Sequence, residues 1–333
     1  MSPDTPTGQT VSASTGTSAS SSVHPCIATT AVLLAGRPSS VRGPSVSTAL
    51  GIPTAALPIN GHASLAALWI DALVAGGFRG EIVIAVANEE AASFHRHLES
   101  DADVSATVRV RVDTAQHRGA AGLVGDIARE RPSPSGEAPD RGVIVIEASN
   151  TPPAGLAEFA SRATADGDAI VGASVDGAPN GVYWLSSEAV GLIPGIGYFD
   201  LKEQLLPAIV ASGRRIHAWI CADEHHRVDE LASYLEAVAR LYDPQRTAHP
   251  TAAVEPGAEV RGNSVLCRGA VVEQGALVVD SVLLPGARVC ADAVVARSVI
   301  PPGTHVPRGY LVVDEVFGAL GSNARLATEG SAS

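Results

Sequence analysis

Residues 32–78 read VLLAGRPSSVRGPSVSTALGIPTAALPINGHASLAALWIDALVAGGF. A short apolar run, Val32–Leu34, ends at Ala35-Gly36, and a loop rich in Gly, Pro, Ser and Arg follows. An amphipathic helix is then predicted from near Ser64 to the glycine pair Gly76-Gly77. This pattern indicates a buried strand, a loop at its carboxyl end, and a helix that packs back on the sheet. In an open α/β sheet, such a loop is where ligands bind.

The next part of the chain alternates between apolar runs and amphipathic stretches. Further strands are predicted at Glu81–Val86, Val108–Val112, Val143–Ile146, Ala169–Val175, Gly181–Leu185 and Arg215–Cys221. Further helices are predicted at Asn88–Leu98, Gly119–Arg131, Pro153–Ala165, Ser187 onward, Tyr198–Ser212 and Val228–Tyr242. This alternation predicts an α/β domain with a doubly wound, mostly parallel sheet.

After Pro244 the periodicity changes to six residues. Aliphatic residues recur, with two one-residue slips, at Val254, Val260, Leu266, Val272, Val278, Leu283, Val289, Val295, Ile300, Val306 and Val312. Glycine follows three positions later at Gly257, Gly269, Gly275, Gly286, Gly303 and Gly309. This is a hexapeptide repeat, which predicts a left-handed parallel β-helix with aliphatic side chains inside and glycine at the corners. We expect roughly three coils of about 18 residues each.

These patterns divide the 333 residues into four parts. We expect a disordered Ser/Thr-rich tail at 1–24, the α/β domain at 25–245, the β-helix at 246–318 and a flexible tail at 319–333. The net charge of −12 without a basic cluster argues against a nucleic-acid partner. The four cysteines have no metal-binding spacing, and no apolar run is long enough to span a membrane. From the same cysteine pattern we expect a reduced, cytoplasmic protein, and the first 22 residues, which lack a basic start, do not resemble a signal peptide.

Four segments share their order with a known family. They are Leu34-Ala35-Gly36 with Leu57-Pro58-Ile59, then HRGAAGL at 117–123, GVYWL at 181–185 and SYLEA at 233–237. In this respect the chain resembles the sugar-1-phosphate nucleotidyltransferases, or nucleotide-sugar pyrophosphorylases, many of which end in a left-handed β-helix. The resemblance implies transfer from a nucleoside triphosphate to a sugar 1-phosphate with Mg²⁺. It also implies a nucleotide site at Leu34, Ala35, Gly36, Arg37, Arg42, Gly119, Ala120, Ala121 and Gly122.

The positions that bear the family's chemistry differ here. Arg37 replaces a glycine of the phosphate loop, and Thr54 replaces a lysine. The resemblance places Ser149 and Arg227 where the family has two metal-binding aspartates. The family's long sugar-binding insert is reduced to the six residues 176–181.

Some remaining side chains could still supply the chemistry. The remaining metal candidates are Glu147, Asp223 and Asp229, and the remaining catalytic candidates are Arg37 and Glu147. The only lysine, Lys202, is flanked by carboxylates, and we expect it to form a solvated ion pair.

Three functions remain open from the sequence. The leading hypothesis is a nucleotidyltransferase-like protein of nucleotide-sugar or polysaccharide metabolism with an eroded active site, acting as a non-catalytic regulatory or assembly subunit. The first alternative is an active sugar-1-phosphate nucleotidyltransferase that uses Mg²⁺ on rearranged ligands. The second is a hexapeptide-repeat acyltransferase, with His305 or His249 as its histidine. We expect a nucleotide or nucleotide-sugar ligand, and a homo-oligomer or hetero-oligomer formed through the β-helix.

Overall fold

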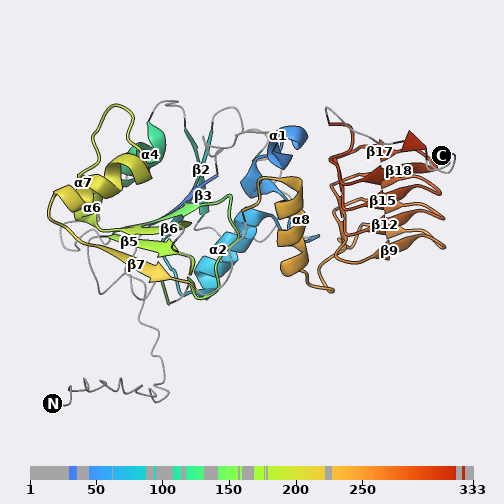
Figure 1. The fold of residues 1–333 in the computed structure, drawn as a ribbon, viewed down its shortest axis with the longest axis horizontal. Coiled ribbons are helices and arrows are strands. Elements are labelled where there is room, and N and C mark those ends of the chain that lie inside the picture. The colour runs from blue at the N-terminus through green and yellow to red at the C-terminus, as the bar shows by residue number, and fades with distance from the viewer. Residues whose placement is uncertain are drawn as a thin grey trace, which may run out of the picture.

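The computed structural model describes residues 30–35, 45–61, 63–87, 94, 108–113, 118–130, 142–156, 158–159, 169–175, 177, 179–221, 227–319 and 325–326. The chain forms an α/β domain followed by a β-helix (Figure 1). The predicted tail at 1–24, the predicted helix Asn88–Leu98 apart from Phe94, and most of the second tail lie outside the described residues. No helix in the described part of the chain has both the length and the apolar character to cross a bilayer.

Seven strands form one sheet in the order β3-β2-β1-β4-β6-β5-β7. β6 is antiparallel to both of its neighbours, and the other pairs are parallel. A parallel crossover needs a dozen or more residues, so the short link from Ala173 to Pro179 requires β6 to turn back. The mostly parallel sheet is thereby confirmed. The strands are β1 Thr30–Leu34, β2 Glu81–Ala87, β3 Val108–Asp113, β4 Val143–Glu147, β5 Ala169–Ala173, β6 Pro179–Leu185 and β7 Ile216–Ile220.

Side chains cap the starts of several helices. Ser64 caps α2 (Leu65–Ala75), with its hydroxyl 3.3 Å from the backbone nitrogen of Ala67. The helix predicted from Tyr198 begins later, because the carboxylate of Asp200 accepts from Lys202 N over 2.7 Å and caps the chain there. The helices are α1 Val46–Leu50, the 3₁₀ turn η1 Thr54–Ala56, α2 Leu65–Ala75, α4 Gly119–Glu130, α6 Ser187–Gly191, the π-helix η2 Leu201–Leu205, α7 Leu206–Ala211 and α8 Leu231–Arg240.

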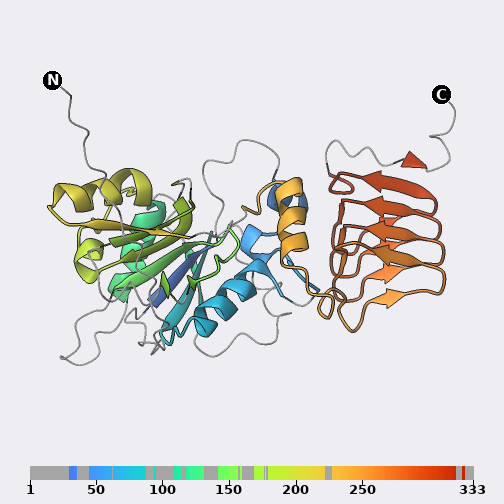
Figure 2. The same cartoon turned by 60° about the horizontal axis from the view of Figure 1, so that its bottom comes forward.

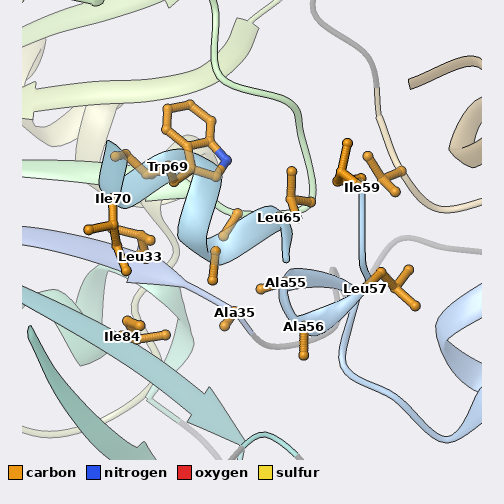
Figure 3. Packing of buried hydrophobic residues seen from close by; sticks show 14 of the residues in the cluster. Leu33, Ala35, Ala55, Ala56, Leu57, Ile59, Leu65, Trp69, Ile70 and Ile84 are labelled. Carbon is orange, nitrogen blue, oxygen red and sulfur yellow. The ribbon is translucent and has the colours of Figure 1, made fainter. Parts of the chain in front are cut away.

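Successive residues of the central strands point to opposite faces, and each face has its own core. On one face, Leu33 and Ile84 pack under Trp69 and Ile70 of α2, as Figure 3 shows. On the other face, Val32 and the alternate residues of β2 and β4 pack against α4, α6, η2 and α7. Both faces are therefore covered, as expected for a doubly wound sheet.

The β-helix contains three short parallel sheets. Its strands are β8 Ala253–Val254, β9 Glu259–Arg261, β10 Val265–Leu266, β11 Val271–Val272, β12 Leu277–Val279, β13 Val282–Leu283, β14 Arg288–Val289, β15 Val294–Ala296, β16 Val299–Ile300, β17 His305–Val306 and β18 Tyr310–Val313, and β18 also pairs with β19 Arg325–Leu326. Most of the predicted aliphatic residues form its interior, where Val272, Val289 and Val312 have no exposed surface. Val254, on the first coil, is 48% exposed. The hexapeptide β-helix is thereby confirmed.

The coil length varies along the β-helix. Val260 and Val278 stack directly on one another 18 residues apart, as predicted, and the later coils are one residue shorter. Val278, Val295 and Val312 stack directly on one another and lie 17 residues apart in the chain. The corner after β9 contains Gly262-Asn263, whereas Asp280 or Arg297 alone turns the later corners, at φ 46° and 45°. Some corners are therefore turned by residues other than the predicted glycines.

Buried serines close these shorter corners. The hydroxyl of Ser281 accepts from the backbone nitrogen of Ser298 over 3.1 Å and donates to the carbonyl of Val279 over 2.7 Å. The hydroxyl of Ser264 is likewise 3.3 Å from the backbone nitrogen of Ser281. Each serine thus ties one coil to the next.

The two domains share one core. The outward side chains of β10, β13 and β16, such as Val265 and Val282, are buried in the same cluster as Tyr234 of α8. The Tyr234 hydroxyl donates to the carbonyl of Pro58. α8 lies between the sheet and the β-helix in both views (Figures 1 and 2).

Candidate functional site

Glu147 lies at the carboxyl end of β4, at the edge where ligands bind in such sheets. Its Oε1 is 2.8 Å from Nζ of Lys202, and its Oε2 is 3.1 Å from the same nitrogen. Lys202 thus forms an ion pair, as predicted, but its partner lies 55 residues away in sequence instead of beside it. The hydroxyl of Tyr183, on β6, donates to Glu147 Oε1 over 3.3 Å.

Tyr183 is a neutral donor in this cluster. Burial raises the pKa of its phenol well above the ordinary value of 10, and the Glu147 carboxylate raises this pKa further. The phenol therefore stays protonated at neutral pH and continues to donate to Glu147.

Ser149 and Arg227 lie side by side. The backbone nitrogen of Val228 donates to the carbonyl of Ser149 over 2.8 Å, and Asn150 forms an antiparallel bridge with Arg227. The indole of Trp69 donates to the carbonyl of Asn150 over 2.7 Å and so fixes the backbone that follows β4. The two positions that the resemblance assigns to metal-binding aspartates therefore meet, although neither holds an aspartate.

Arg227 is itself paired. Its Nε donates to the carboxylate of Asp229, which is one of the predicted metal candidates. The Asp229 side chain is only 8% exposed, whereas the Arg227 side chain is 49% exposed. A buried carboxylate therefore holds a guanidinium whose outer side reaches solvent.

These residues do not fit Mg²⁺. Mg²⁺ binds oxygen ligands, usually one or two carboxylates, waters and substrate phosphates. Glu147 and Asp229 each contact a cationic side chain of the chain itself, which a metal ion would have to displace. Within the described ranges, no group of three or more His, Cys, Asp or Glu residues could hold a metal ion. Asp223 lies outside the described residues.

The first half of the predicted nucleotide site is only partly described. Ala35 N donates to the carbonyl of Ala85 over 2.9 Å, and Leu34 O accepts from Ala148 N over 3.1 Å. These bonds place the end of β1 beside the end of β4. Gly36, Arg37 and Arg42 lie outside the described residues.

The second half, Gly119–Gly122, forms the first turn of α4. Gly119 has φ 72°, and a Cβ there would lie 2.7 Å from the carbonyl oxygen of Phe199. That carbonyl accepts from Gly122 N over 3.0 Å, and Phe199 N donates to Arg118 O over 2.8 Å. Ala121 is fully buried. The segment before η2 therefore packs directly on the predicted nucleotide-binding turn.

Arg118 holds the segment before η2 in place through hydrogen bonds. This role was not predicted from the sequence. Its guanidinium donates to the carbonyls of Pro194 and Gly197, and it pairs with Asp126 at 2.8 and 3.0 Å. Hydrogen bonding from Arg118 lowers the pKa of Asp126 below its usual range. Because the partners are 8 and 76 or more residues apart, the sequence held no local signal for them.

The two histidines of the acyltransferase alternative belong to the β-helix. His305 is exposed on β17 and lies beside Arg288 of β14. His249 Nδ1 lies 2.9 Å from the hydroxyl of Thr251. These positions leave that alternative a prediction.

Comparison with known proteins adds two similarities. Residues 249–315 match the family model described as GlmU-like, C-terminal hexapeptide. Among solved structures, the chain is similar to HddC from Yersinia pseudotuberculosis, with 18% sequence identity, a TM-score of 0.49, and coverage of 63% of this chain and 98% of that one. No curated protein matches the chain. The match at 249–315 agrees with the resemblance to nucleotidyltransferases that carry a hexapeptide β-helix.

Proposed function

We propose that this protein is a nucleotidyltransferase-like subunit of nucleotide-sugar or polysaccharide metabolism that regulates or assembles other proteins without catalysing transfer. The observation that supports this is the meeting of Ser149 and Arg227 at the end of β4. Transfer of a phosphoryl group depends on cations that bridge the phosphates and neutralise developing charge. The positions that would hold such a metal contain a hydroxyl and a guanidinium.

A turnover assay tests the absence of catalysis. We would incubate the full chain with Mg²⁺, each nucleoside triphosphate and a set of sugar 1-phosphates, and measure released pyrophosphate. The expected result is no release above that of a heat-denatured sample. Release that is lost in a Glu147→Gln variant would contradict the proposal, because it would assign the activity to this chain and not to a contaminant.

The assembly role needs a surface, and the β-helix has one. The inward residues of β12, β15 and β18 are buried, so their neighbours point outward. These neighbours stack in two apolar columns, Leu277, Val294 and Leu311 beside Val279, Ala296 and Val313. They are partly exposed, and Val313 is 36% exposed. The other apolar outward face, on β10, β13 and β16, is already covered by α8.

We infer that a second copy of this chain covers these columns. Apolar side chains repeat in register along this sheet, which allows two copies to pack face to face about a two-fold axis. The charges at one end, Glu259 and Arg261, already pair with each other.

Light scattering would measure the mass of the wild type and of Val294→Glu, with His305→Glu on another face as the matched control. A dimer that only Val294→Glu dissociates is expected. A monomeric wild type would contradict self-association and would direct the search to a different protein.

A further inference from the structure

Arg227 stands at the place of the second metal-binding carboxylate of the resemblance. The fold brings Arg227 next to Ser149, which stands at the position of the first metal-binding carboxylate. Val228 N donates to Ser149 O over 2.8 Å, and Arg227 forms a bridge with Asn150. The positive charge of the guanidinium therefore lies near the edge where a metal ion would otherwise supply it.

Asp229 fixes the orientation of that charge. Its nearly buried carboxylate accepts from Nε of Arg227, and its backbone carbonyl accepts from Val46 N over 2.9 Å. A guanidinium has five N–H donors, so this contact leaves donors on the half-exposed side. Paired N–H donors in a plane match the oxygens of a phosphate group.

Glu147 offers no vacant place for a metal on the other side of the turn. Both of its oxygens contact Lys202, and Tyr183 donates to one of them. A divalent ion there would have to displace the ammonium group of Lys202. The two positive charges would then lie close together and repel each other.

We propose that Arg227 binds the phosphate group of a ligand at this edge and replaces the divalent metal in that role. This inference rests on the proposed function, since a subunit that senses a metabolite needs the ligand but not the transfer. The ligand is a phosphate ester. A nucleotide sugar and a sugar 1-phosphate share this chemistry, so the experiment must separate them.

Calorimetric titration of the full chain tests the proposal. The probes are UDP-glucose, GDP-mannose, glucose 1-phosphate and mannose 1-phosphate, each with EDTA and again with Mg²⁺. We expect at least one probe to bind in EDTA, with a Kd that Mg²⁺ changes by less than about threefold. Binding of the sugar phosphates alone, or of the nucleotide sugars alone, would identify the source of the phosphate and uphold the proposal.

Variants then test the residue. Arg227→Met should weaken binding by about ten- to a hundredfold, the usual worth of a charge-assisted hydrogen bond. Arg227→Lys should fall between, because it keeps the charge but loses the planar donors. Arg308→Met is the matched control, since Arg308 forms a similar ion pair with Asp292 on the β-helix. Thermal unfolding of each variant checks that the fold is intact.

Three results would overturn the proposal: no probe binds, binding requires Mg²⁺, or Arg227→Met binds as tightly as the wild type. None of these results would show that the chain catalyses transfer. The proposed function is tested separately, by the measurement of pyrophosphate release.

Discussion

The interior of the β-helix and the end of β4 are built on opposite principles. In the β-helix, aliphatic residues such as Val272 and Val289 stack on one another with no exposed surface. At the end of β4, Glu147 pairs with Lys202 and the neighbouring segment pairs Arg227 with Asp229. The first region is stable through burial repeated along the chain. The second balances each charged side chain with a partner of opposite charge, so its chemistry can change while its backbone is kept.

The largest expected effect comes from a charge inside the β-helix. Val289→Asp should cost more than about 4 kcal/mol of unfolding free energy, because an unpaired carboxylate would enter a dry core. Val254→Asp is the matched control, since Val254 lies in the same column but is 48% exposed on the first coil. Denaturant unfolding measures both variants. Equal losses would contradict the view that the stacked interior stabilises this domain.

A substitution at Gly119 tests how tightly the predicted nucleotide-binding turn is covered. Gly119→Ala should cost about 2–4 kcal/mol, since a Cβ would meet Phe199 O at 2.7 Å and the backbone has a positive φ. Gly213→Ala has a similar φ of 79° but open space around the Cβ position, so about 1 kcal/mol is expected. Thermal unfolding compares the two. Similar costs would mean that the packing of Phe199 on this turn is loose.

The Arg118–Asp126 pair should make stability depend on pH. The native pKa of Asp126 lies below the ordinary 3.8, so the unfolded chain binds its proton more readily. The contribution of the pair is therefore complete above about pH 4 and is lost as the pH falls through the native pKa.

Asp126→Asn should then cost about 1–3 kcal/mol at pH 7, and the difference from wild type should shrink below about pH 4. Asp71→Asn, at an exposed position of α2, is the control. If the difference in unfolding free energy between Asp126→Asn and the wild type stayed constant across the pH range, the ion pair would not be its cause.

A smaller effect is expected at the serine corners. Ser281→Ala would leave the buried nitrogen of Ser298 without its 3.1 Å acceptor and should cost about 1–2 kcal/mol. Ser187→Ala, which removes only a solvent-exposed hydrogen bond to Glu188, should change stability by less than about 0.5 kcal/mol. Denaturant midpoints measure both. A neutral Ser281→Ala would show that the coils need no polar link.

The same two regions differ in how far the sequence predicts them. The aliphatic period alone predicted the β-helix interior, because each inward residue contacts the equivalent aliphatic residue of the next coil. The two one-residue slips in the period marked the shorter corners, but residue type did not predict that Asp280 and Arg297 would adopt a positive φ there. In the sheet, the alternation of apolar runs placed the strands, whereas the short β5–β6 link determined the antiparallel strand.

At the site, the sequence indicated positions but not partners. The resemblance indicated that Ser149 and Arg227 occupy the positions of two metal-binding aspartates, and the structure places these two positions side by side. Nothing local predicted that Lys202 would reach Glu147 or that Arg118 would hold the segment before η2, because such contacts depend on tertiary packing. The roles of Gly36, Arg37, Arg42 and Asp223 stay predictions.

Binding of Mn²⁺, followed by electron paramagnetic resonance, tests most directly whether a side chain has replaced the metal. The wild type should hold no Mn²⁺ through Glu147 or Asp229, whereas a Ser149→Asp/Arg227→Asp variant should hold one ion at the restored pair of carboxylates. A wild type that binds one Mn²⁺, and loses it in Glu147→Gln or Asp229→Asn, would contradict the account.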